Sequence, residues 1–203
     1  MNLLGFLSAA VLITLMPGPD ILFVITQSIT RGRKSGIIFA AGLCSGLIFH
    51  ITAVCLGISV LLYRSPVAFT TLKFAGAAYL IYLGVKAFLH RRQASLRFDA
   101  ASGSGGQKLY RKGILMNLLN PKVILFFLAF FPQFVDPAAE SPVLQMLLLG
   151  LIFMAQALVI FSCVAVLADK LSAGLMKNPG VAYWMNVAEA VIYCVIGVSI
   201  LFM

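Results

Sequence analysis

Six long apolar segments constrain the fold of this chain more than any other feature of its sequence. They cover residues 3–29, 37–62, 67–89, 113–135, 143–168 and 182–203. Each is longer than the ~20 apolar residues that a helix needs to cross the hydrocarbon core of a bilayer. Overall, 62% of the 203 residues are hydrophobic and 10% are charged, whereas a soluble domain has about half and a quarter. Because backbone groups find no water in hydrocarbon, the spans must be helical. We therefore expect an all-α integral membrane protein with six transmembrane helices.

The basic residues predict how these helices are oriented. Twelve of the 15 lysines and arginines lie in or beside the loops after the first, third and fifth segments, from Arg31 to Lys177. Only Arg64 and Lys73 flank the opposite side. Because positive residues are retained in the cytoplasm, we expect both termini outside. The net charge of +9 is thus explained by membrane orientation, and we predict no nucleic-acid partner.

A polar linker divides the six segments into two sets of three. Residues 91–107 are rich in glycine, serine and charge, which is typical of a flexible connection. We predict a single transmembrane domain with a first repeat at 1–90, a linker at 91–112 and a second repeat at 113–203. Three spans is an odd number, so the second repeat must cross the membrane in the opposite sense. The halves would then be two inverted three-helix repeats.

Each repeat carries a proline inside its first apolar segment. Pro19 and Pro121 correspond at an offset of 102 residues, each after a turn-favouring residue, Gly18 or Asn120, and Pro17 adds a second helix breaker. Proline lacks an N–H donor and clashes with the preceding helical turn. In lipid, such an opened backbone is tolerated only if protein or a wet cavity surrounds it. We expect the first helix of each repeat to be broken at proline, with a substrate site where the breaks meet.

The residues after the two prolines are charged and opposite in sign. Asp20 follows Pro19, and Lys122 follows Pro121. A charge at the bilayer centre costs about 2.5–3.5 kcal/mol even on the mildest scale, so each needs a partner or water. One interpretation is a structural ion pair that clamps the two halves. The other, which we favour, is a site for a zwitterion, with Lys122 near its carboxylate and Asp20 near its ammonium group.

The chain resembles the LysE/RhtB family of bacterial amino-acid exporters. The matching pieces are MPGPD at 16–20, GRKSGIIFAAGLCSG at 32–46, KFAGAAYLIYLG at 73–84 and GILMNLLNPKVILFFLAFFPQFV at 113–135. They occur in the family's order and span most of the chain. The family's motif positions carried over here are Gly18, Pro19, Asp20, Asn120, Pro121 and Lys122.

The resemblance implies a secondary transporter in the bacterial cytoplasmic (inner) membrane. Members export amino acids such as homoserine, threonine, leucine or lysine, and the resemblance implies proton antiport with alternating access. The partners would be a small amino acid, a proton and the lipid bilayer, with no cofactor and no enzymatic activity. Gly-rich helix faces make a homodimer a further possibility.

Four other polar residues within the spans are candidates for the site. Asn117 and Tyr79 are candidates to line the cavity. His50 is a candidate proton relay, because its unperturbed pKa is near neutral, or it bonds a neighbouring backbone carbonyl. Glu189 is a second candidate for proton coupling, or it lies close enough to the interface to be hydrated.

Two alternative functions come from the cysteines and His50. Divalent heavy-metal export would use Cys44, His50 and Cys55, but their spacing does not place them on one helical face. A membrane thiol–disulfide redox conduit would need a cysteine at each helix break, and those places hold Asp20 and Lys122. We therefore predict no metal site and expect the four cysteines to be buried hydrophobic residues.

Overall fold

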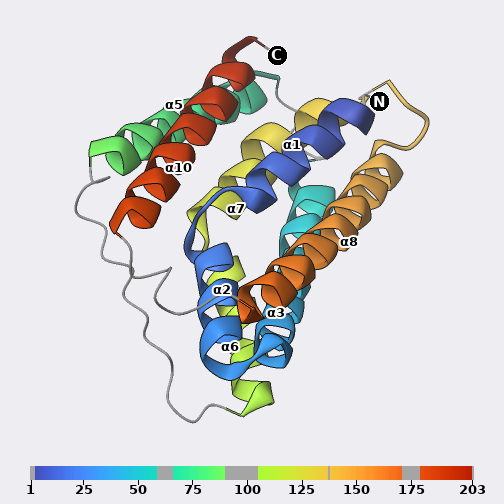
Figure 1. Cartoon of the computed structure of the whole chain (residues 1–203). Coiled ribbons are helices and arrows are strands. Elements are labelled where there is room, and N and C mark those ends of the chain that lie inside the picture. The colour runs from blue at the N-terminus through green and yellow to red at the C-terminus, as the bar shows by residue number, and fades with distance from the viewer. Residues whose placement is uncertain (1–2, 59–65, 90–104, 137, 171–178, 203) are drawn as a thin grey trace.

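The computed structural model describes residues 3–58, 66–89, 105–136, 138–170 and 179–202. All the secondary structure in these ranges is helical (Figure 1). The α-helices are α1 (Leu3–Leu15), α2 (Pro19–Arg31), α3 (Arg33–Ala53), α5 (Pro66–Leu89), α6 (Gly106–Leu118), α7 (Pro121–Leu125), α8 (Pro142–Asp169) and α10 (Pro179–Phe202). Two π-helical segments, η1 (Val54–Ile58) and η2 (Phe126–Phe130), and one 3₁₀ segment, η3 (Phe131–Phe134), extend α3 and α7. The predicted all-α architecture is confirmed.

Both predicted helix breaks are present. The axis bends by 56° between α1 and α2 and by 48° between α6 and the helix that begins at Pro121. Without N–H groups, Pro17 and Pro19 cannot bond the carbonyls of Ile13 and Leu15, and Pro121 cannot bond that of Asn117. The prolines remove the bonds that would continue each helix, and Pro19 and Pro121 become the favoured first residues of α2 and α7.

The helices are long and apolar enough for a membrane protein. By length and composition, residues Arg33–Gly57 and Pro142–Asp169 qualify as single spans, and each bent pair qualifies as a broken span or a re-entrant loop. Helices α5 and α10 have 24 residues each, or about 36 Å at 1.5 Å per residue, which also exceeds a ~30 Å hydrocarbon core. That these two helices span the membrane remains a prediction.

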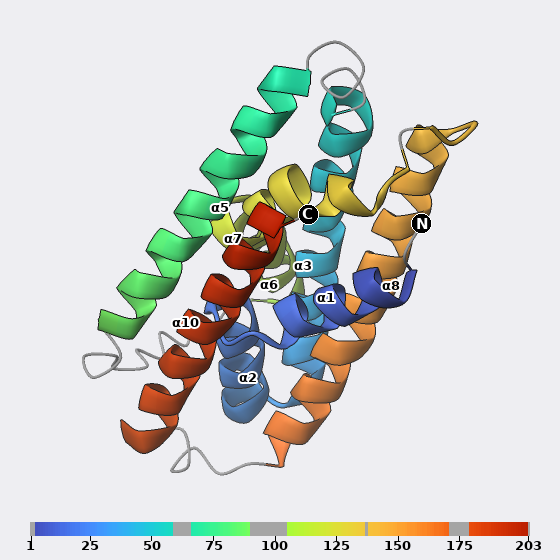
Figure 2. The same ribbon diagram turned by 90° about the horizontal axis from the view of Figure 1, so that it is seen from above.

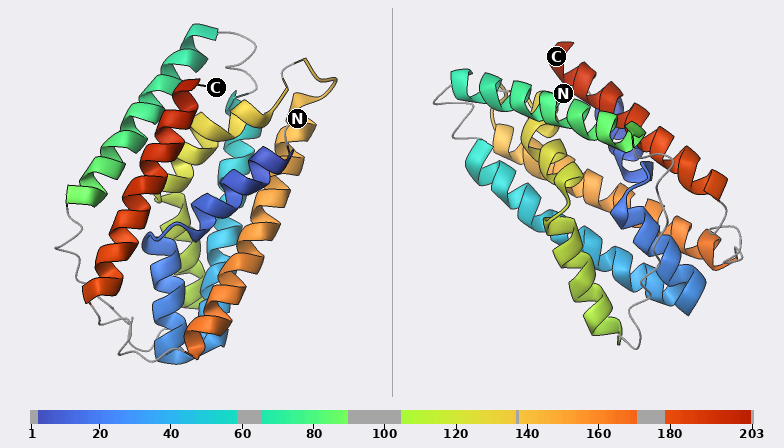
Figure 3. Two further views of the ribbon diagram at one scale, coloured as in Figure 1. Left: turned by 45° about the horizontal axis from the view of Figure 1, so that its top comes forward. Right: turned by 90° about the vertical axis from the view of Figure 1, so that its left-hand side faces the viewer.

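The helices form a main bundle and a separate pair. In the bundle, α3 packs against α2, α6 and α8, and α1 crosses α8 (Figures 1 and 2). Helix α10 packs along α5 at one side of this bundle. Both termini lie at the same end of the molecule, opposite the turn between α2 and α3 (Figure 3). Which end faces the cytoplasm remains a prediction.

Glycine allows α3 and α6 to approach closely. A Cβ on Gly113 would lie 2.5 Å from the Phe39 carbonyl oxygen and 2.9 Å from the Leu43 nitrogen. A Cβ on Gly42 would collide with the Tyr110 carbonyl. Nearby, the Tyr110 hydroxyl donates a 2.7 Å hydrogen bond to Ser45 Oγ. The broken helix of the second half is therefore held against the first half by backbone contact.

Helix α6 begins at Gly106, earlier than the apolar segment predicted from residue 113. Its first turns carry Lys108, Arg111 and Lys112, which are exposed. Hydropathy detects only the apolar part of a helix, and lysine and arginine favour helix as well as most apolar residues do. Residues 91–104 of the predicted linker lie outside the described residues.

Candidate functional site

Asp20 lies in the first turn of α2, directly after the first helix break. Gly18 is the N-cap residue and offers no side-chain cap, so the carboxylate of Asp20 supplies the negative charge at this helix N-terminus. Asp20 is only 2% exposed. A buried carboxylate requires compensation, and this comes from the second helix break.

Asn120 connects the two breaks through a single side chain. Its Oδ1 accepts a 3.0 Å bond from the Lys122 backbone nitrogen and so caps α7. Its Nδ2 donates a 2.6 Å hydrogen bond to Asp20 Oδ2. Because capping directs Oδ1 towards the Lys122 nitrogen, it also directs Nδ2 towards the carboxylate of Asp20.

Lys122 reaches from the second break into the first. Its Nζ donates to the Met16 carbonyl, 3.4 Å away, within the opened segment between α1 and α2. The ammonium group also interacts electrostatically with Asp20. Lys122 is 3% exposed, so a buried cation and a buried anion, one from each half, offset one another.

His50 on α3 bonds to the carbonyl that Pro121 leaves without its helical donor. Its Nε2 lies 3.3 Å from the Asn117 oxygen, which also accepts from the Asn120 backbone nitrogen at 3.0 Å. Because the acceptor is a carbonyl, Nε2 carries the proton in this bond. The ring stacks on Phe127 at 5.8 Å. This is the structural role that was one of the two expectations for His50.

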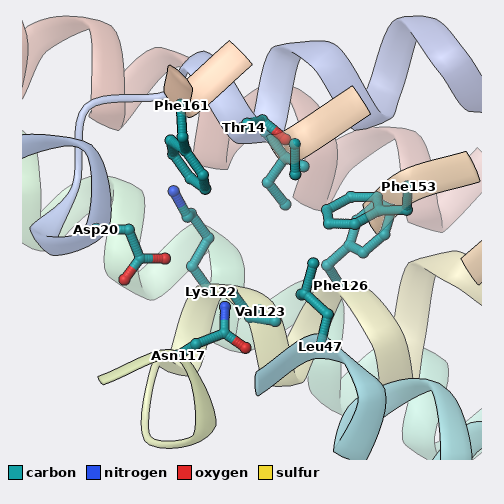
Figure 4. A pocket seen from close by; sticks show the side chains of 11 residues that line it. Thr14, Asp20, Leu47, Asn117, Lys122, Val123, Phe126, Phe153 and Phe161 are labelled. Atoms are coloured by element: carbon teal, nitrogen blue, oxygen red, sulfur yellow. The ribbon is translucent and has the colours of Figure 1, made fainter. Parts of the chain in front are cut away.

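Asp20 and Lys122 line one small cavity (Figure 4). Its volume is about 20 Å³, which is room for about one water molecule. The described residues offer no hydrogen bond to Asp20 Oδ1 or to Asn117 Oδ1, although both atoms are buried. Two unpaired acceptors beside a cavity indicate a place for a donor, such as a water molecule or an ammonium group.

The opposite wall of the cavity is apolar and was not predicted from the sequence. Phe153, Ala157 and Phe161 of α8 face it (Figure 4), at the four-residue spacing that places side chains on one helical face. This stripe was detectable in principle, but α8 is apolar all round, so its pattern does not single out one face. Gln156 does not line the cavity, but it donates a 2.9 Å hydrogen bond to Oγ1 of Thr14, which does.

Phenylalanines fill the space between this cavity and the end of the molecule that carries the N-terminus. Phe6 of α1 contacts Phe131 and Phe134 edge-on, at 5.7 and 5.4 Å between ring centroids. Phe126 continues the cluster to Phe153, at 4.9 Å. These rings are buried. The cavity is thus closed towards that end by packed aromatic side chains.

Three further candidate residues do not line the cavity in the described part of the structure. Tyr79 is 42% exposed on α5 and packs against Tyr82, whereas its neighbours Gly76, Ala77 and Leu80 are buried. Pro17 is half-buried at the first break. Glu189 belongs to α10, and its side chain lies outside the described part of the structure.

The cysteines do not converge on the breaks. Only Cys44 is fully buried, Cys55 and Cys194 are partly buried, and Cys163 is exposed, so the expectation of uniform burial was wrong. Cys163 lies on the exposed face of α8, which lipid would cover if this helix spans the membrane. Within the described ranges, no group of three or more His, Cys, Asp or Glu side chains could hold a metal ion.

The fold and the site together define the class of this protein. It is an all-helical membrane protein with a buried charged site where two helices are broken. The chain belongs to the LysE type translocator family, whose model matches residues 11–203. It is 35% identical to the homoserine/homoserine lactone efflux protein of Salmonella typhimurium, over 95% of this chain and 92% of that protein. It is 34% identical to the leucine efflux protein of Klebsiella pneumoniae, over 74% of this chain and 71% of that protein. An uncharacterized membrane protein of Vibrio cholerae is 36% identical, over 90% and 88%. No solved structure matches the chain.

Proposed function

We propose that this protein exports small amino acids from the cytoplasm. The observation that carries the proposal is the meeting of Asp20 and Lys122, one from each helix break, at a single buried cavity. A zwitterionic amino acid presents an ammonium group and a carboxylate, which are complementary to these two charges. The names of the relatives, which describe efflux of homoserine, homoserine lactone and leucine, support the same substrate class.

The unpaired acceptors define where the substrate's ammonium group would bind. Asp20 Oδ1 and Asn117 Oδ1 accept no hydrogen bond from the described residues, so they could receive two of its three donors. The substrate carboxylate would bind Lys122 in place of the long 3.4 Å bond to the Met16 carbonyl. Substrate binding would thus replace the hydrogen bond between Lys122 and the Met16 carbonyl with two interactions, one from the substrate to Asp20 and one to Lys122. The buried charges remain compensated in both states.

The substrate side chain would face α8. Phe153, Ala157 and Phe161 present an apolar surface opposite the charges, which suits side chains such as that of leucine. The cavity of about 20 Å³ is smaller than any amino acid, so transport requires the helices to separate. Alternating access between two inverted repeats, with the proline breaks as hinges, would supply that movement.

Proton antiport would use the same carboxylate. Asp20 would release a proton when it binds the substrate ammonium group and would take one up for the return step. The burial of Asp20 supports this role, because the buried carboxylate would need a proton in a return step that takes it away from both the substrate and Lys122. No other described acidic side chain lines the cavity.

Efflux from loaded proteoliposomes tests the site. We expect Asp20→Asn and Lys122→Met each to abolish efflux of every transported amino acid. Asp136→Asn and Lys108→Met remove the same charges at exposed positions and should leave efflux unchanged. If both site variants exported at the rate of the parent protein, the assignment would be wrong. Loss of activity in the control variants would show that the assay reports net charge only.

A further inference from the structure

One polar side chain in the cavity lining has no part in binding the charged groups of the substrate. Asp20, Asn117 and Lys122 are the polar lining residues that the proposed function uses, and Thr14 is the remaining one among the described residues. Thr14 belongs to α1, before the first helix break, and is 4% exposed. Figure 4 shows it beside the phenylalanines of α8 and apart from Asp20. Thr14 therefore lies on the wall that would face the substrate side chain.

The hydroxyl group of Thr14 is already committed as a donor. Its one proton is donated to the Ala10 carbonyl, at 2.7 Å. One of its two lone pairs accepts from Gln156 Nε2, at 2.9 Å. Since a hydroxyl group has one donor and two acceptor positions, Thr14 keeps one acceptor position and no donor for a further partner.

Gln156 of α8 fixes this arrangement from the neighbouring helix. Its Nε2 also donates to the Ala10 carbonyl, at 3.4 Å, so the amide nitrogen has two acceptors on α1. Because Thr14 has no proton left to give, the amide must turn its nitrogen and not its oxygen towards Thr14. The amide oxygen, Oε1, is buried and accepts no hydrogen bond from the described residues. The pair of Thr14 and Gln156 thus has its hydrogens in use and acceptors to spare.

An excess of acceptors favours a substrate side chain that donates a hydrogen bond. A purely aliphatic side chain would leave the Thr14 acceptor buried against carbon, which is unfavourable. A second ammonium group would need a second acid, and Asp20 is the one acid among the described residues of the lining. A neutral hydroxyl group satisfies the acceptor without adding a buried charge. Its methylene groups would still pack against the apolar wall that Phe153 and Ala157 provide.

We propose that Thr14 is a specificity-determining residue that recognises a hydroxyl group at the end of a short substrate side chain. Thr14 accepts the hydrogen bond from this hydroxyl group, and Gln156 is a positioning residue that orients Thr14. This inference rests on the proposed export of amino acids and deepens it, because the two charges of the site recognise every amino acid alike. Thr14 would distinguish among side chains.

Two amino acids of equal length test the preference. L-Homoserine ends in a hydroxyl group, and L-norvaline carries a methyl group in its place. The measurement is kcat/KM for efflux of each from proteoliposomes loaded over a range of concentrations, and the ratio of the two values is the selectivity. We expect the parent protein to prefer L-homoserine at least about tenfold. Water can also donate to a free acceptor, so this comparison of hydroxyl with methyl is the decisive one.

Thr14→Val removes the hydroxyl group with little change in shape. We expect it to lower the preference about fivefold, the effect of one neutral hydrogen bond, by slowing export of L-homoserine and not of L-norvaline. Thr14→Ser should keep the preference within about twofold of the parent, because serine retains the hydroxyl group. Thr26→Val is the matched control, since Thr26 is also buried and also donates to the carbonyl four residues earlier but does not line the cavity.

Gln156→Leu tests the positioning role. It should lower the preference in the same direction but by less, because the hydroxyl group of Thr14 remains. The double variant Thr14→Val/Gln156→Leu should match Thr14→Val alone, since Gln156 acts through Thr14. A further fall in the double variant would contradict that role. If Thr14→Val exported neither amino acid, an unchanged preference in Gln156→Leu would overturn the proposal and a lowered one would support it.

The remaining outcomes separate this inference from the proposed function. A parent protein that exports neither amino acid, nor any other, refutes the proposed function. Export of both amino acids with equal kcat/KM, or an unchanged preference in an active Thr14→Val protein, refutes recognition by Thr14 alone. An equal fall in Thr26→Val would also overturn it, because the preference would then follow from the loss of any buried hydroxyl group.

Discussion

Asn120 donates a 2.6 Å hydrogen bond to the carboxylate of Asp20, a residue 100 positions earlier in the chain. The same side chain caps α7 through the Lys122 backbone nitrogen. One amide therefore couples the geometry of the second helix break to the charge at the first. Movement of one break relative to the other would therefore change the bond between Asn120 and Asp20.

Asn120→Ala should harm export more than the loss of a helix cap can explain. A cap contributes about 1 kcal/mol, and a hydrogen bond to a charged group contributes about 1.5–3 kcal/mol. Ser141→Ala removes the cap of α8, where Ser141 Oγ accepts from the Leu144 nitrogen, and is the control. We expect Asn120→Ala to reduce the efflux rate at least about tenfold and Ser141→Ala to leave it within about twofold of the parent. Equal rates for the two variants would mean that capping is the only role of Asn120.

Removing one of the two buried, opposite charges of Asp20 and Lys122 should destabilise the protein more than removing both. Lys122→Met leaves Asp20 buried without its cation, at a cost of about 3–5 kcal/mol. The double variant Asp20→Asn/Lys122→Met should recover most of that loss while remaining inactive. Thermal unfolding in detergent measures the difference. Destabilisations of the single variants that simply add in the double variant would show that the two charges do not interact.

Gly113→Ala should separate α3 from α6. Its Cβ would lie 2.5 Å from the Phe39 carbonyl oxygen, which is backbone and cannot rotate away. We expect a loss of about 1–3 kcal/mol in the free energy of unfolding, as for other overpacked contacts. Gly57→Ala is the control, because no described atom lies within 4 Å of the added Cβ. A Gly113→Ala protein as stable as Gly57→Ala would contradict the close helix contact.

Ala157→Leu should change which amino acids are exported. The larger side chain would fill the apolar wall opposite the ion pair, so branched substrates should be rejected while small ones are still exported. One or a few methylene groups in an apolar pocket shift selectivity by about 1–3 kcal/mol, or about 10–200-fold. Ala155→Leu makes the same change on the exposed face of α8 and should not alter selectivity. Competition assays with a panel of unlabelled amino acids measure the ratio, and an unaltered ranking in Ala157→Leu would remove α8 from the substrate site.

His50→Leu should affect stability and leave proton coupling intact. The variant loses the 3.3 Å bond to the Asn117 carbonyl, which is a loss of about 1 kcal/mol. Export measured from pH 5.5 to 8.5 should keep the shape of the parent profile, because His50 bonds backbone and does not line the cavity. A shifted pH profile would instead identify His50 as a proton relay.

Part of this site could be read from the sequence because it depends on local chemistry. Proline removes a backbone hydrogen bond from a helix and kinks or breaks it, so Pro19 and Pro121 predicted the breaks from the chain alone. A charge inside an apolar span needs compensation, so Asp20 and Lys122 could each be predicted to need a partner or water before any contact was known. Tyr79 was a candidate on polarity alone, and polarity does not show which face of a helix points inward.

Sequence by itself determined the number of apolar segments, the two points where helices open and the opposite charges beside them. Each follows from the conformation of one residue or from the cost of exposing polar groups to hydrocarbon. Only the tertiary structure decided that Asn120 bridges the breaks, that His50 supplies the donor that Pro121 lacks, and that one face of α8 lines the cavity. These relationships depend on which helices lie side by side, and in an almost uniformly apolar chain hydropathy is nearly the same for every possible pairing.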